Sequence, residues 1–316
     1  MYYVGVDIGG TSIKAGIVSD VGTILYKTVK ATQKNNEKDL SKQITEIIED
    51  VLKGFHITYH EIESIGIGCP GIIEFEKGVV NDADNLGIKS YPLKERLEAV
   101  IPKPILVEND ANCATIGEYC MLKDSNVNSM IMLTLGTGIG GGIIIDNNLY
   151  TGCDGSAGEF GNIVISVDGQ RVWWEEYASA QALVRMAEAA AMECKNSILY
   201  KLIEKSNGRA NGEMVFNALR QKDKVTEVVF ENYIKYLGDG IISILYIFRP
   251  EVLSIGGGIS QADLLWEPLM KYIDENSDWK KRECKTEIRK AVLGNDAGII
   301  GAAGLGNMYK CNNWRK

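Results

Sequence analysis

Residues 6–18 are VDIGGTSIKAGIV, and residues 133–145 are LTLGTGIGGGIII. Each stretch is an alternating apolar run, a turn rich in glycine and threonine, and a second apolar run. This pattern is typical of a β-hairpin closed by a glycine turn. Because the two stretches keep a constant offset along their length, we infer that one module occurs twice. The sequence therefore predicts two related α/β domains with a cleft between them.

The segments around the hairpins alternate between helical and strand patterns. We expect strands at 64–68, 104–108, 252–255 and 288–293, and helices at 37–55, 93–100, from 111, over much of 179–248, from 263 and at 297–310. The segment 152–175 shows no period, and we expect it to be irregular. No low-complexity linker marks a boundary, so the duplication alone places the domains at 1–112 and 113–296.

The composition is that of a globular protein and excludes several classes of function. Apolar residues make up 45% of the 316 residues, and the net charge is −8. So acidic a chain has no general attraction for nucleic acid or an anionic membrane. The apolar run 241–248 is far shorter than the about 20 residues that span a bilayer, and MYYVGVDIGG lacks a basic leader. We expect a cytoplasmic protein without nucleic-acid or membrane partners.

Cysteine and histidine offer little chemistry here. The seven cysteines are scattered without a Cys-x-x-Cys motif, so we expect free thiols in a reducing compartment. His56 and His60 have the i, i+4 spacing of a metal pair, but no companion ligand lies at motif spacing, and surface positions suit them better. A catalytic acid or base is then expected among carboxylates, Lys, Tyr or Cys.

The glycine turns are candidates for binding phosphate, because without a Cβ their N–H groups approach anionic oxygens closely. GTGIGG in the second turn matches the dinucleotide pattern GxGxxG, but a β-rich run follows where that site needs a helix. Asp7 stands at the mouth of the first turn and suits Mg²⁺ held through water. Thr11 offers a hydroxyl and Lys14 a cation. Local hydrogen bonding within a turn is the alternative.

Asp110 is the candidate general base. The run ILVENDAN predicts a strand that ends at Glu-Asn-Asp and leads into a helix, and ligand sites of α/β sheets lie at such strand ends. A carboxylate there can accept the proton of a hydroxyl that attacks phosphorus. The segment alone favours a helix N-cap at Asn109 or Asp110 over a general base, and both interpretations stay open.

Polar loop residues suggest a polyhydroxylated ligand, since each sugar hydroxyl donates and accepts a hydrogen bond. The candidates, for which ordinary loop positions are the alternative, are Asn85, Glu159, Asn162, Glu175 and Glu176. Trp173 and Trp174 are either a stacking platform or core aromatics. GGGIS at 256–260 suits either the adenosine part of a nucleotide or close packing of a helix on a strand.

Taken together, these motifs resemble the ROK family (repressors, open reading frames and sugar kinases) of the actin-like ATPase superfamily, over essentially the whole chain. The resemblance is carried by DIGGTSIKAGIV, GCPGIIE, NDADNLG, VENDANCATIGE, LTLGTGIGGGIII, GSAGEFGN, EEYAS, PEVLSIGGGIS and LGNDAGIIGAA. Within the family the chain is most similar to bacterial glucokinases. The resemblance implies a two-domain actin-like (ribonuclease H-like) α/β fold with a central cleft, in which the last helix, about 297–316, packs back on the first domain.

The resemblance also implies a reaction, phosphoryl transfer from ATP to the 6-hydroxyl of a hexose, with glucose the first expectation, and a homodimer. Asp110 would be the catalytic base. Sugar hydroxyls would be bound by Asn85, Asn109, Asp110, Glu159, Asn162 and Glu175. Phosphates and Mg²⁺ would be bound by Asp7, Gly9, Gly10, Thr11, Lys14, Thr137, Gly138 and Gly140, and adenosine would lie near Gly257 and Gly258.

One departure from the family concerns zinc. ROK kinases commonly hold a structural zinc on one His and three Cys, and the matching positions here are Asn162, Ser166, Asp168 and Trp173. These residues cannot form a tetrahedral zinc site, so we expect no zinc, and packing anchored by Trp173 and Trp174 in its place.

The missing His is also expected to touch the sugar, which leaves the substrate open. Kinases of N-acetylmannosamine, fructose or a β-glucoside are alternatives, as is a catalytically weak sugar-binding or regulatory protein. The family's DNA-binding repressors carry a winged-helix domain before the first phosphate motif. Here that motif starts at Val4, so we expect no such domain.

Overall fold

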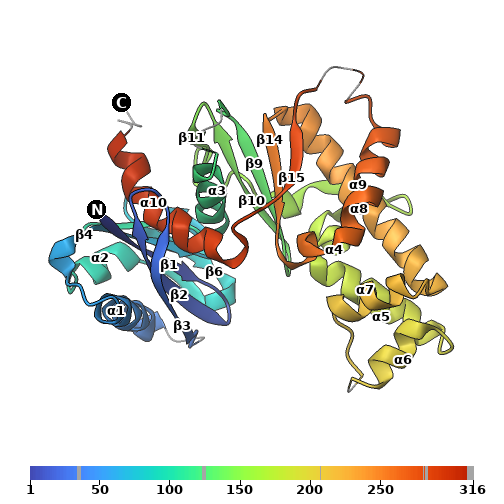
Figure 1. The fold of residues 1–316 in the computed structure, drawn as a ribbon, viewed down its shortest axis with the longest axis horizontal. Helices are drawn as coiled ribbons and strands as arrows, with labels where there is room; N and C mark the ends of the chain where they lie inside the picture. The colour runs from blue at the N-terminus through green and yellow to red at the C-terminus, as the bar shows by residue number, and fades with distance from the viewer. Residues whose placement is uncertain (34–36, 123–125, 207, 280, 282–283, 312–316) are drawn as a thin grey trace. The chain divides into compact units, whose positions relative to one another are not determined.

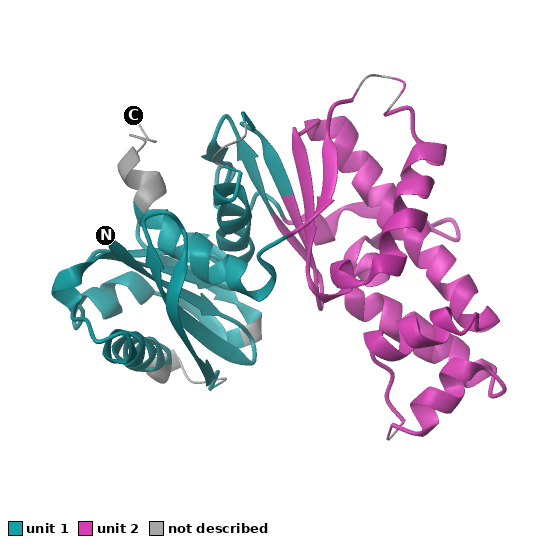
Figure 2. Cartoon of the chain, viewed as in Figure 1, with its two compact units in different colours: residues 1–131, 142–158, 292–316 teal, residues 132–141, 159–291 magenta. Residues whose placement is uncertain are grey.

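The computed structural model describes residues 1–33, 37–122, 126–206, 208–279, 281 and 284–311. The chain divides into two compact units (Figure 2). Unit 1 contains residues 1–131, 142–158 and 292–316, and unit 2 contains residues 132–141 and 159–291. The sequence-based boundary between residues 112 and 113 falls within helix α3 (Asp110–Cys120). As a statement about domains, that boundary stays a prediction.

Unit 1 is built on a five-stranded sheet in the order β3–β2–β1–β4–β8 (Figure 1). The first glycine stretch forms the antiparallel hairpin β1–β2, in which Asp7 pairs with Lys14. β4 joins β1 in parallel, and β8 joins β4 in parallel. The strands are β1 (Tyr2–Ile8), β2 (Ser12–Ser19), β3 (Ile24–Ala31), β4 (Ile62–Cys69) and β8 (Ile105–Asn109).

The second glycine stretch begins a second five-stranded sheet in the corresponding order, β11–β10–β9–β14–β15. Its strands are β9 (Met130–Leu135), β10 (Ile139–Ile145), β11 (Asn148–Leu149), β14 (Val252–Gly256) and β15 (Glu287–Lys290). β14 and β15 are parallel, as β4 and β8 are. The matching strand orders confirm that one module occurs twice.

The alternation of side chains along β1 sends them to two different layers, as the period of a strand requires. One layer is helix α1 (Glu37–Gly54), whose apolar side chains share a buried core with Val4, Val6 and Ile8. The opposite layer is helix α10 (Ala297–Cys311), where Ile299 and Ala303 pack against Tyr3. The sheet of unit 1 is thus covered by α1 on one face and α10 on the other.

Glycines let α10 approach its neighbours backbone to backbone. A Cβ on Gly5 of β1 would collide with the carbonyl oxygen of Ile299, and a Cβ on Gly66 of β4 with that of Ala302. From the helix itself, a Cβ on Gly301 would collide with the carbonyl oxygen of Cys113 in α3. The small-residue run AGIIGAAGLG is therefore required by packing against two layers at once.

The chain leading into α10 is held by side chains of unit 1. The buried carboxylate of Glu118, in α3, accepts hydrogen bonds from the backbone N–H groups of Val292 (3.1 Å) and Leu293 (2.7 Å). Lys27 of β3 pairs with Asp296 at 2.7 Å, in the 3-10 helix η5 (Gly294–Asp296) that precedes α10. These contacts fix where α10 begins relative to the sheet.

The rest of unit 1 includes a small antiparallel sheet that the sequence analysis did not predict. It has the order β5–β6–β7 and consists of β5 (Ile72–Glu74), β6 (Val79–Ala83) and β7 (Ile88–Tyr91). Short helices adjoin it along the chain: η1 (Tyr59–Glu61), η2 (Asp84–Leu86) and α2 (Leu93–Glu98).

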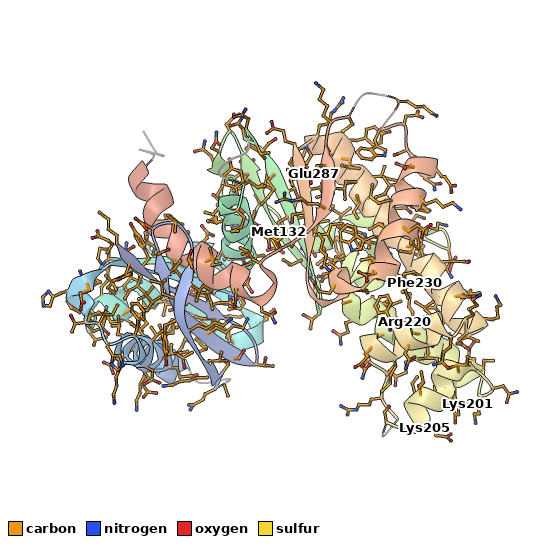
Figure 3. The ribbon with its side chains drawn as sticks, viewed as in Figure 1. Met132, Lys201, Lys205, Arg220, Phe230 and Glu287 are labelled. Atoms are coloured by element: carbon orange, nitrogen blue, oxygen red, sulfur yellow. The ribbon has the colours of Figure 1, made fainter. Side chains whose placement is uncertain are left out.

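Helices make up most of unit 2, as expected for residues 179–248. They are η3 (Phe160–Asn162), α4 (Glu175–Ala178), α5 (Ala180–Glu193), α6 (Ile198–Glu204), α7 (Gly212–Arg220), α8 (Lys224–Phe248), η4 (Gly258–Gln261) and α9 (Asp263–Asn276). Phe230 of α8, which Figure 3 labels, contacts the ring of Phe216 in α7 edge to face. Side-chain oxygens cap α5 through α8 at Ser179, Ser197, Asn211 and Asp223.

The expectation of an irregular segment over 152–175 is wrong for its second half. β12 (Val164–Val167) and β13 (Gln170–Trp173) form an antiparallel hairpin. Its two turn residues, Asp168 and Gly169, have positive φ values of 51° and 78°. Asp-Gly between VISV and QRVW, two short runs with β-branched and aromatic residues, is a hairpin signal that outweighs the absence of a period on which the expectation rested.

Gly301→Ala is expected to destabilise unit 1 by about 1–3 kcal/mol, because the added methyl group must displace the backbone of α3. The matched control is Gly304→Ala in the same helix, where the new Cβ would lie 3.4 Å from the nearest atom, a methyl carbon of Ile116. That change should be neutral or stabilising, since alanine is the better helix former. Apparent melting temperatures of the two variants test the difference; equal values would show that α10 packs loosely on α3.

Candidate functional site

The ends of three parallel strands place the acidic candidates of unit 1 at one edge of its sheet. Asp7 of β1 pairs in register with Gly68 of β4, and Gly68 pairs with Glu108 of β8. Asp110 follows two residues after Glu108 and begins α3. Because ligands of α/β sheets bind at the carboxyl ends of parallel strands, this edge is the candidate functional site of unit 1.

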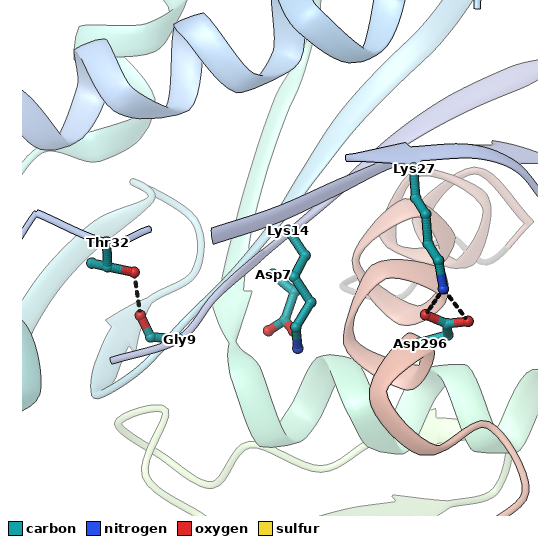
Figure 4. A network of polar contacts seen from close by, with 6 residues as sticks. All are labelled: Asp7, Gly9, Lys14, Lys27, Thr32 and Asp296. Carbon is teal, nitrogen blue, oxygen red and sulfur yellow. Dashed lines mark hydrogen bonds and ion pairs between the residues drawn. The ribbon is translucent and has the colours of Figure 1, made fainter. Parts of the chain in front are cut away.

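Asp7 and Lys14 form an ion pair across the first hairpin (Figure 4). Lys14 Nζ lies 2.9 Å from Asp7 Oδ2, and the Asp7 side chain is 16% exposed. The sequence analysis expected both residues at the phosphate site, and the structure brings them into direct contact. The pair holds a carboxylate and a cation side by side at the mouth of the glycine turn.

The first glycine turn is fixed by backbone hydrogen bonds. The Gly9 N–H donates to the Ser12 carbonyl at 2.9 Å, and the Thr32 hydroxyl donates to the Gly9 carbonyl at 2.7 Å (Figure 4). The Thr32 N–H donates to the Thr11 carbonyl at 3.0 Å. Thr11 itself is exposed and Gly10 is half-buried. The turn therefore has a set shape and leaves the Thr11 hydroxyl accessible to a ligand.

The structure decides which residue caps α3. Asn109 Oδ1 accepts hydrogen bonds from the N–H groups of Ala111 and Asn112 at 2.9 and 3.1 Å, which makes Asn109 the N-cap. Asp110 is the first helical residue, is partly buried, and accepts a hydrogen bond from Ala111. The cap interpretation thus applies to Asn109, and Asp110 retains its place in the candidate site.

Asn109 also links the end of β8 to the turn at Pro70 and Gly71. Its Nδ2 donates to the Gly71 carbonyl at 3.0 Å. Gly71 has a φ of 99°, and a Cβ there would collide with the Asp82 carbonyl oxygen. The turn therefore lies directly against β6, which leads into η2 and Asn85. The Asn85 side chain lies outside the described part of the chain.

Two buried thiols lie beneath this edge. Burial raises the pKa of Cys69, and the negative charge of Asp110 adds to the rise. Burial is also the main cause of the raised pKa of Cys113, and the negative charges of Glu108, Asp7 and Asp110 raise it further. Both Asp7 and Asp110 thus act on the same thiol, in keeping with their places at one edge of the sheet. Both thiols stay protonated at neutral pH and act as packing groups.

Unit 1 also contains a cavity of about 410 Å³ that the sequence analysis missed. Glu108, the residue before Asn109, forms part of its wall. The remaining lining residues are Ile73, Glu74, Phe75, Glu76, Thr151, Gly152, Cys153, Asp154 and Gly155. These residues lie far apart in the sequence, so no local pattern marks the cavity. It forms only when residues 151–155 pack beside β5.

In unit 2, the Glu175 side chain contacts the second glycine turn. Its Oε2 accepts a hydrogen bond from the Ile139 N–H at 3.1 Å. A Cβ on Gly138 or Gly161 would collide with the same carboxylate, so both glycines make room for it. Thr137, next to Gly138, is exposed and Gly140 is half-buried. The structure thus brings together a candidate sugar ligand and a candidate phosphate turn within one unit.

Glu159 lies near Glu175. Loss of solvent around the Glu159 carboxyl, and then the negative charge of Glu175, raise the pKa of Glu159. Asn162 follows in η3, and its N–H donates to the Glu159 carbonyl at 3.2 Å. These three expected sugar ligands therefore come from neighbouring segments of unit 2.

The turn after β14 carries the candidate adenosine residues. Gly257 has a φ of 91°, and a Cβ there would collide with the carbonyl oxygen of Leu135 at the end of β9. Beside Gly258, no heavy atom of the described chain lies within 4 Å of where a Cβ would stand. Gly257 is thus required for close packing, whereas Gly258 borders open space that can receive a ligand.

The expectation that Trp173 fills the place of zinc is wrong. Trp173 is 50% exposed, because it pairs with Val164 on the outward face of the β12–β13 hairpin. Trp174 is fully buried, and its Nε1 donates to the Tyr236 carbonyl at 2.8 Å. A Cβ on Gly240 would collide with its ring. Trp174, and not Trp173, therefore anchors the segment on α8, together with Phe160, whose ring contacts that of Phe248 edge to face.

The other three positions that match the zinc ligands are also spread along the hairpin. Asn162 ends η3, Ser166 is in β12 and Asp168 is in the turn. Within the described residues, no group of three or more His, Cys, Asp or Glu side chains is arranged to hold a metal ion.

The fold and the strand-edge site define a protein of the actin-like ATPase class, and comparisons with known proteins identify its family. The chain matches the ROK family over residues 3–308 and belongs to that family. It is 34% identical to a glucokinase of Halalkalibacterium halodurans, covering 96% of this chain and 94% of the relative. It is 35% identical to a glucokinase of Streptomyces coelicolor, covering 96% of each.

Solved structures agree. The chain is 33% identical to a ROK family glucokinase from Streptomyces griseus, solved in complex with glucose and AMPPNP. The match has a TM-score of 0.79 and covers 96% of this chain and 99% of the other. Separately, none of the helices in the described ranges combines the length and apolar character needed to cross a membrane.

Glu159→Gln is expected to stabilise the ligand-free protein at neutral pH. Above its raised pKa, ionised Glu159 destabilises the folded state; where it is protonated in both the folded and unfolded states, the substitution changes nothing. The gain in melting temperature should therefore be present at pH 7.5 and shrink toward about pH 4. Glu193→Gln, at the exposed end of α5, is the control. A gain independent of pH would contradict the charge argument.

Purified protein is expected to contain no stoichiometric zinc. Structural zinc needs about four Cys or His ligands, and packing of Trp174 on α8 orders this segment here. Elemental analysis measures the zinc content, and addition of a chelator should leave the melting temperature unchanged. About one zinc per chain, lost together with stability on chelation, would overturn the match of residues 162–173 to the family's zinc segment.

Proposed function

We propose that this protein is an ATP-dependent hexose kinase that phosphorylates the 6-hydroxyl of its sugar, with glucose as the substrate. The observation that carries the proposal is the sheet edge of unit 1, where Asp7 lies near the end of β1, beside the glycine turn, and Asp110 directly follows the parallel strand β8. The glucokinases at 34% and 35% identity, and the S. griseus enzyme bound to glucose and AMPPNP, support glucose and ATP as the substrates.

Asp110 is proposed as the general base. Asp110 is the first residue of α3 and directly follows Asn109, the N-cap of that helix, so the cap fixes its backbone position. A carboxylate held there accepts the proton of the sugar 6-hydroxyl as that oxygen attacks the terminal phosphorus of ATP. The bond from that phosphorus to the bridging oxygen breaks, and ADP leaves with the electron pair.

The sugar hydroxyls are proposed to bind polar side chains. One N–H of the Asn109 amide donates to the Gly71 carbonyl, and the amide oxygen accepts from the N–H groups of Ala111 and Asn112. The second N–H of the same amide is therefore proposed to donate to a sugar hydroxyl. The full set proposed for sugar binding is Asn85, Asn109, Asp110, Glu159, Asn162 and Glu175.

The phosphates of ATP are proposed to bind the two glycine turns. Gly9, Gly10, Thr11 and Lys14 serve in unit 1, and Thr137, Gly138 and Gly140 serve in unit 2. Gly257 and Gly258 are proposed to lie near adenosine, where Gly258 borders open space.

The residues present fit Mg²⁺. Asp7 offers a carboxylate and Thr11 an exposed hydroxyl, and Mg²⁺ prefers oxygen ligands and is usually held by one or two carboxylates, waters and substrate phosphates. Asp7 would hold the ion through water. When bound, Mg²⁺ supplies positive charge that offsets the charge of the phosphates. We further propose that the protein is a cytoplasmic homodimer. It would act in carbohydrate metabolism, at the first step of glycolysis.

An ADP-release assay over a panel of hexoses tests the proposed function. ADP formation that depends on both glucose and Mg²⁺, with glucose 6-phosphate as the product, is expected. Preference for N-acetylmannosamine, fructose or a β-glucoside would correct the substrate. No ADP release with any sugar, from protein that binds glucose, would instead support a sugar-binding or regulatory role.

Asp110→Asn tests the base in the same assay. The amide keeps the shape of the carboxylate but cannot take the proton, so kcat should fall about 10²–10⁴-fold while the affinity for sugar changes only a few-fold. Glu193→Gln is the control, because Glu193 lies at the exposed end of α5 and has no proposed part in sugar binding or catalysis. A kcat near that of the wild type would show that Asp110 is not the base.

A further inference from the structure

We propose that the C-terminal helix α10 is a working part of the phosphate site, because Gly298 positions the Asp7 carboxylate. The inference rests on the proposed function, in which Asp7 holds Mg²⁺ at the ATP phosphates. Gly298 lies in LGNDAGIIGAA, a run to which neither the sequence analysis nor the proposed mechanism assigns a role. It is a positioning residue, since it acts through Asp7.

The first step of the argument is the direction of side chains along β1. Residues 3, 5 and 7 share one face of the strand, because successive side chains alternate. Tyr3 packs against Ile299 and Ala303, and Gly5 approaches the carbonyl of Ile299. Asp7 is the next residue on this face, so its carboxylate is directed to the layer that α10 forms.

The second step is the contact itself. A Cβ built on Gly298 would lie 2.7 Å from Asp7 Cγ and 2.9 and 3.0 Å from its two oxygens, and these are its three nearest atoms. A real Cβ does not come that close to a carboxylate. The aspartate side chain has only two rotatable bonds and is held by Lys14 at 2.9 Å. The methyl group would therefore push the carboxylate away from its place.

The third step is that α10 cannot retreat to make room. Gly301, one turn further along α10, touches the backbone of α3, and Gly5 and Gly66 touch α10 from the sheet. Before the helix, Glu118 holds the amides of residues 292 and 293, and Lys27 holds Asp296 (Figure 4). Asp7 thus lies between Lys14 and a helix fixed along its length.

The position also has an electrostatic consequence. Gly298 is the second residue of α10, so the Asp7 carboxylate faces the first turn of a fifteen-residue helix. The N-terminal turn carries partial positive charge from its N–H groups. Together with Lys14, this positive charge attracts the Asp7 carboxylate and helps to hold it in place.

Gly298→Ala tests the proposal through the binding of ATP, measured by calorimetry with Mg²⁺ and again with a chelator. In the wild type, ATP should bind more tightly with Mg²⁺ than without it. In Gly298→Ala this ratio should fall about tenfold, equivalent to about 1.4 kcal/mol, while binding of metal-free ATP and of glucose is unchanged. Gly304→Ala, with room for its methyl group, is the matched control and should keep the wild-type ratio.

A double-mutant cycle with Asp7→Ala separates a positioning role from a purely structural one. With the carboxylate removed, the collision with Asp7 is gone, so Gly298→Ala should then leave the ATP-binding ratio unchanged and should not lower the melting temperature. Should Gly298→Ala fold poorly, recovery of its stability in the Asp7→Ala background supports the collision, and failure to recover overturns it. An unchanged Mg²⁺ ratio in a folded Gly298→Ala protein also overturns the proposal.

The two proposals fail in different ways. Absence of sugar-dependent ADP release from the wild type contradicts the hexose kinase function. A wild type that is active, with Gly298→Ala behaving as Gly304→Ala does in the ATP-binding measurement, contradicts only the role of α10.

Discussion

Contact between the backbone of α10 and the backbones of β1, β4 and α3 is the constraint on which unit 1 depends. Glycine alone permits it, at Gly5, Gly66 and Gly301, because a single Cβ at any of these positions would meet a carbonyl oxygen. The contact covers one face of the sheet with residues far along the chain and so ties the C-terminal segment to the first strand. It also decides what stands beside Asp7, where the chemistry is proposed to occur.

The candidate site uses the same groups for structure and for function. Asn109 caps α3, holds the Pro-Gly turn through Gly71, and stands next to the proposed base. Glu175 fixes the second glycine turn through Ile139 and is a proposed sugar ligand. A ligand that binds Asn109 or Glu175 would therefore contact a side chain whose hydrogen bond also holds a turn in shape.

Sequence reasoning found what repeats or alternates. The duplicated hairpin, the parallel strand ends and the family were all predictable, because each is marked by local composition at a regular spacing. The cap of α3 was not, since Asn109 and Asp110 are both good caps and only the backbone geometry separates them. The exposure of Trp173 was also not predictable, since Trp173 and Trp174 are adjacent aromatics and only the pairing of Trp173 in the hairpin turns its side chain outward. The cavity and the contact of Gly298 with Asp7 join distant segments, and nothing local marks them.

The central claim is that the strand edge holding Asp7 and Asp110 activates a sugar hydroxyl toward ATP. A crystal structure with glucose and a non-hydrolysable ATP analogue measures this most directly, through the distance from the Asp110 carboxylate to the sugar 6-hydroxyl. The account predicts a hydrogen bond of about 2.6–3.2 Å, with the terminal phosphate at the first glycine turn. A 6-hydroxyl bound to another residue, with the Asp110 carboxylate turned to the amides of α3, would contradict it.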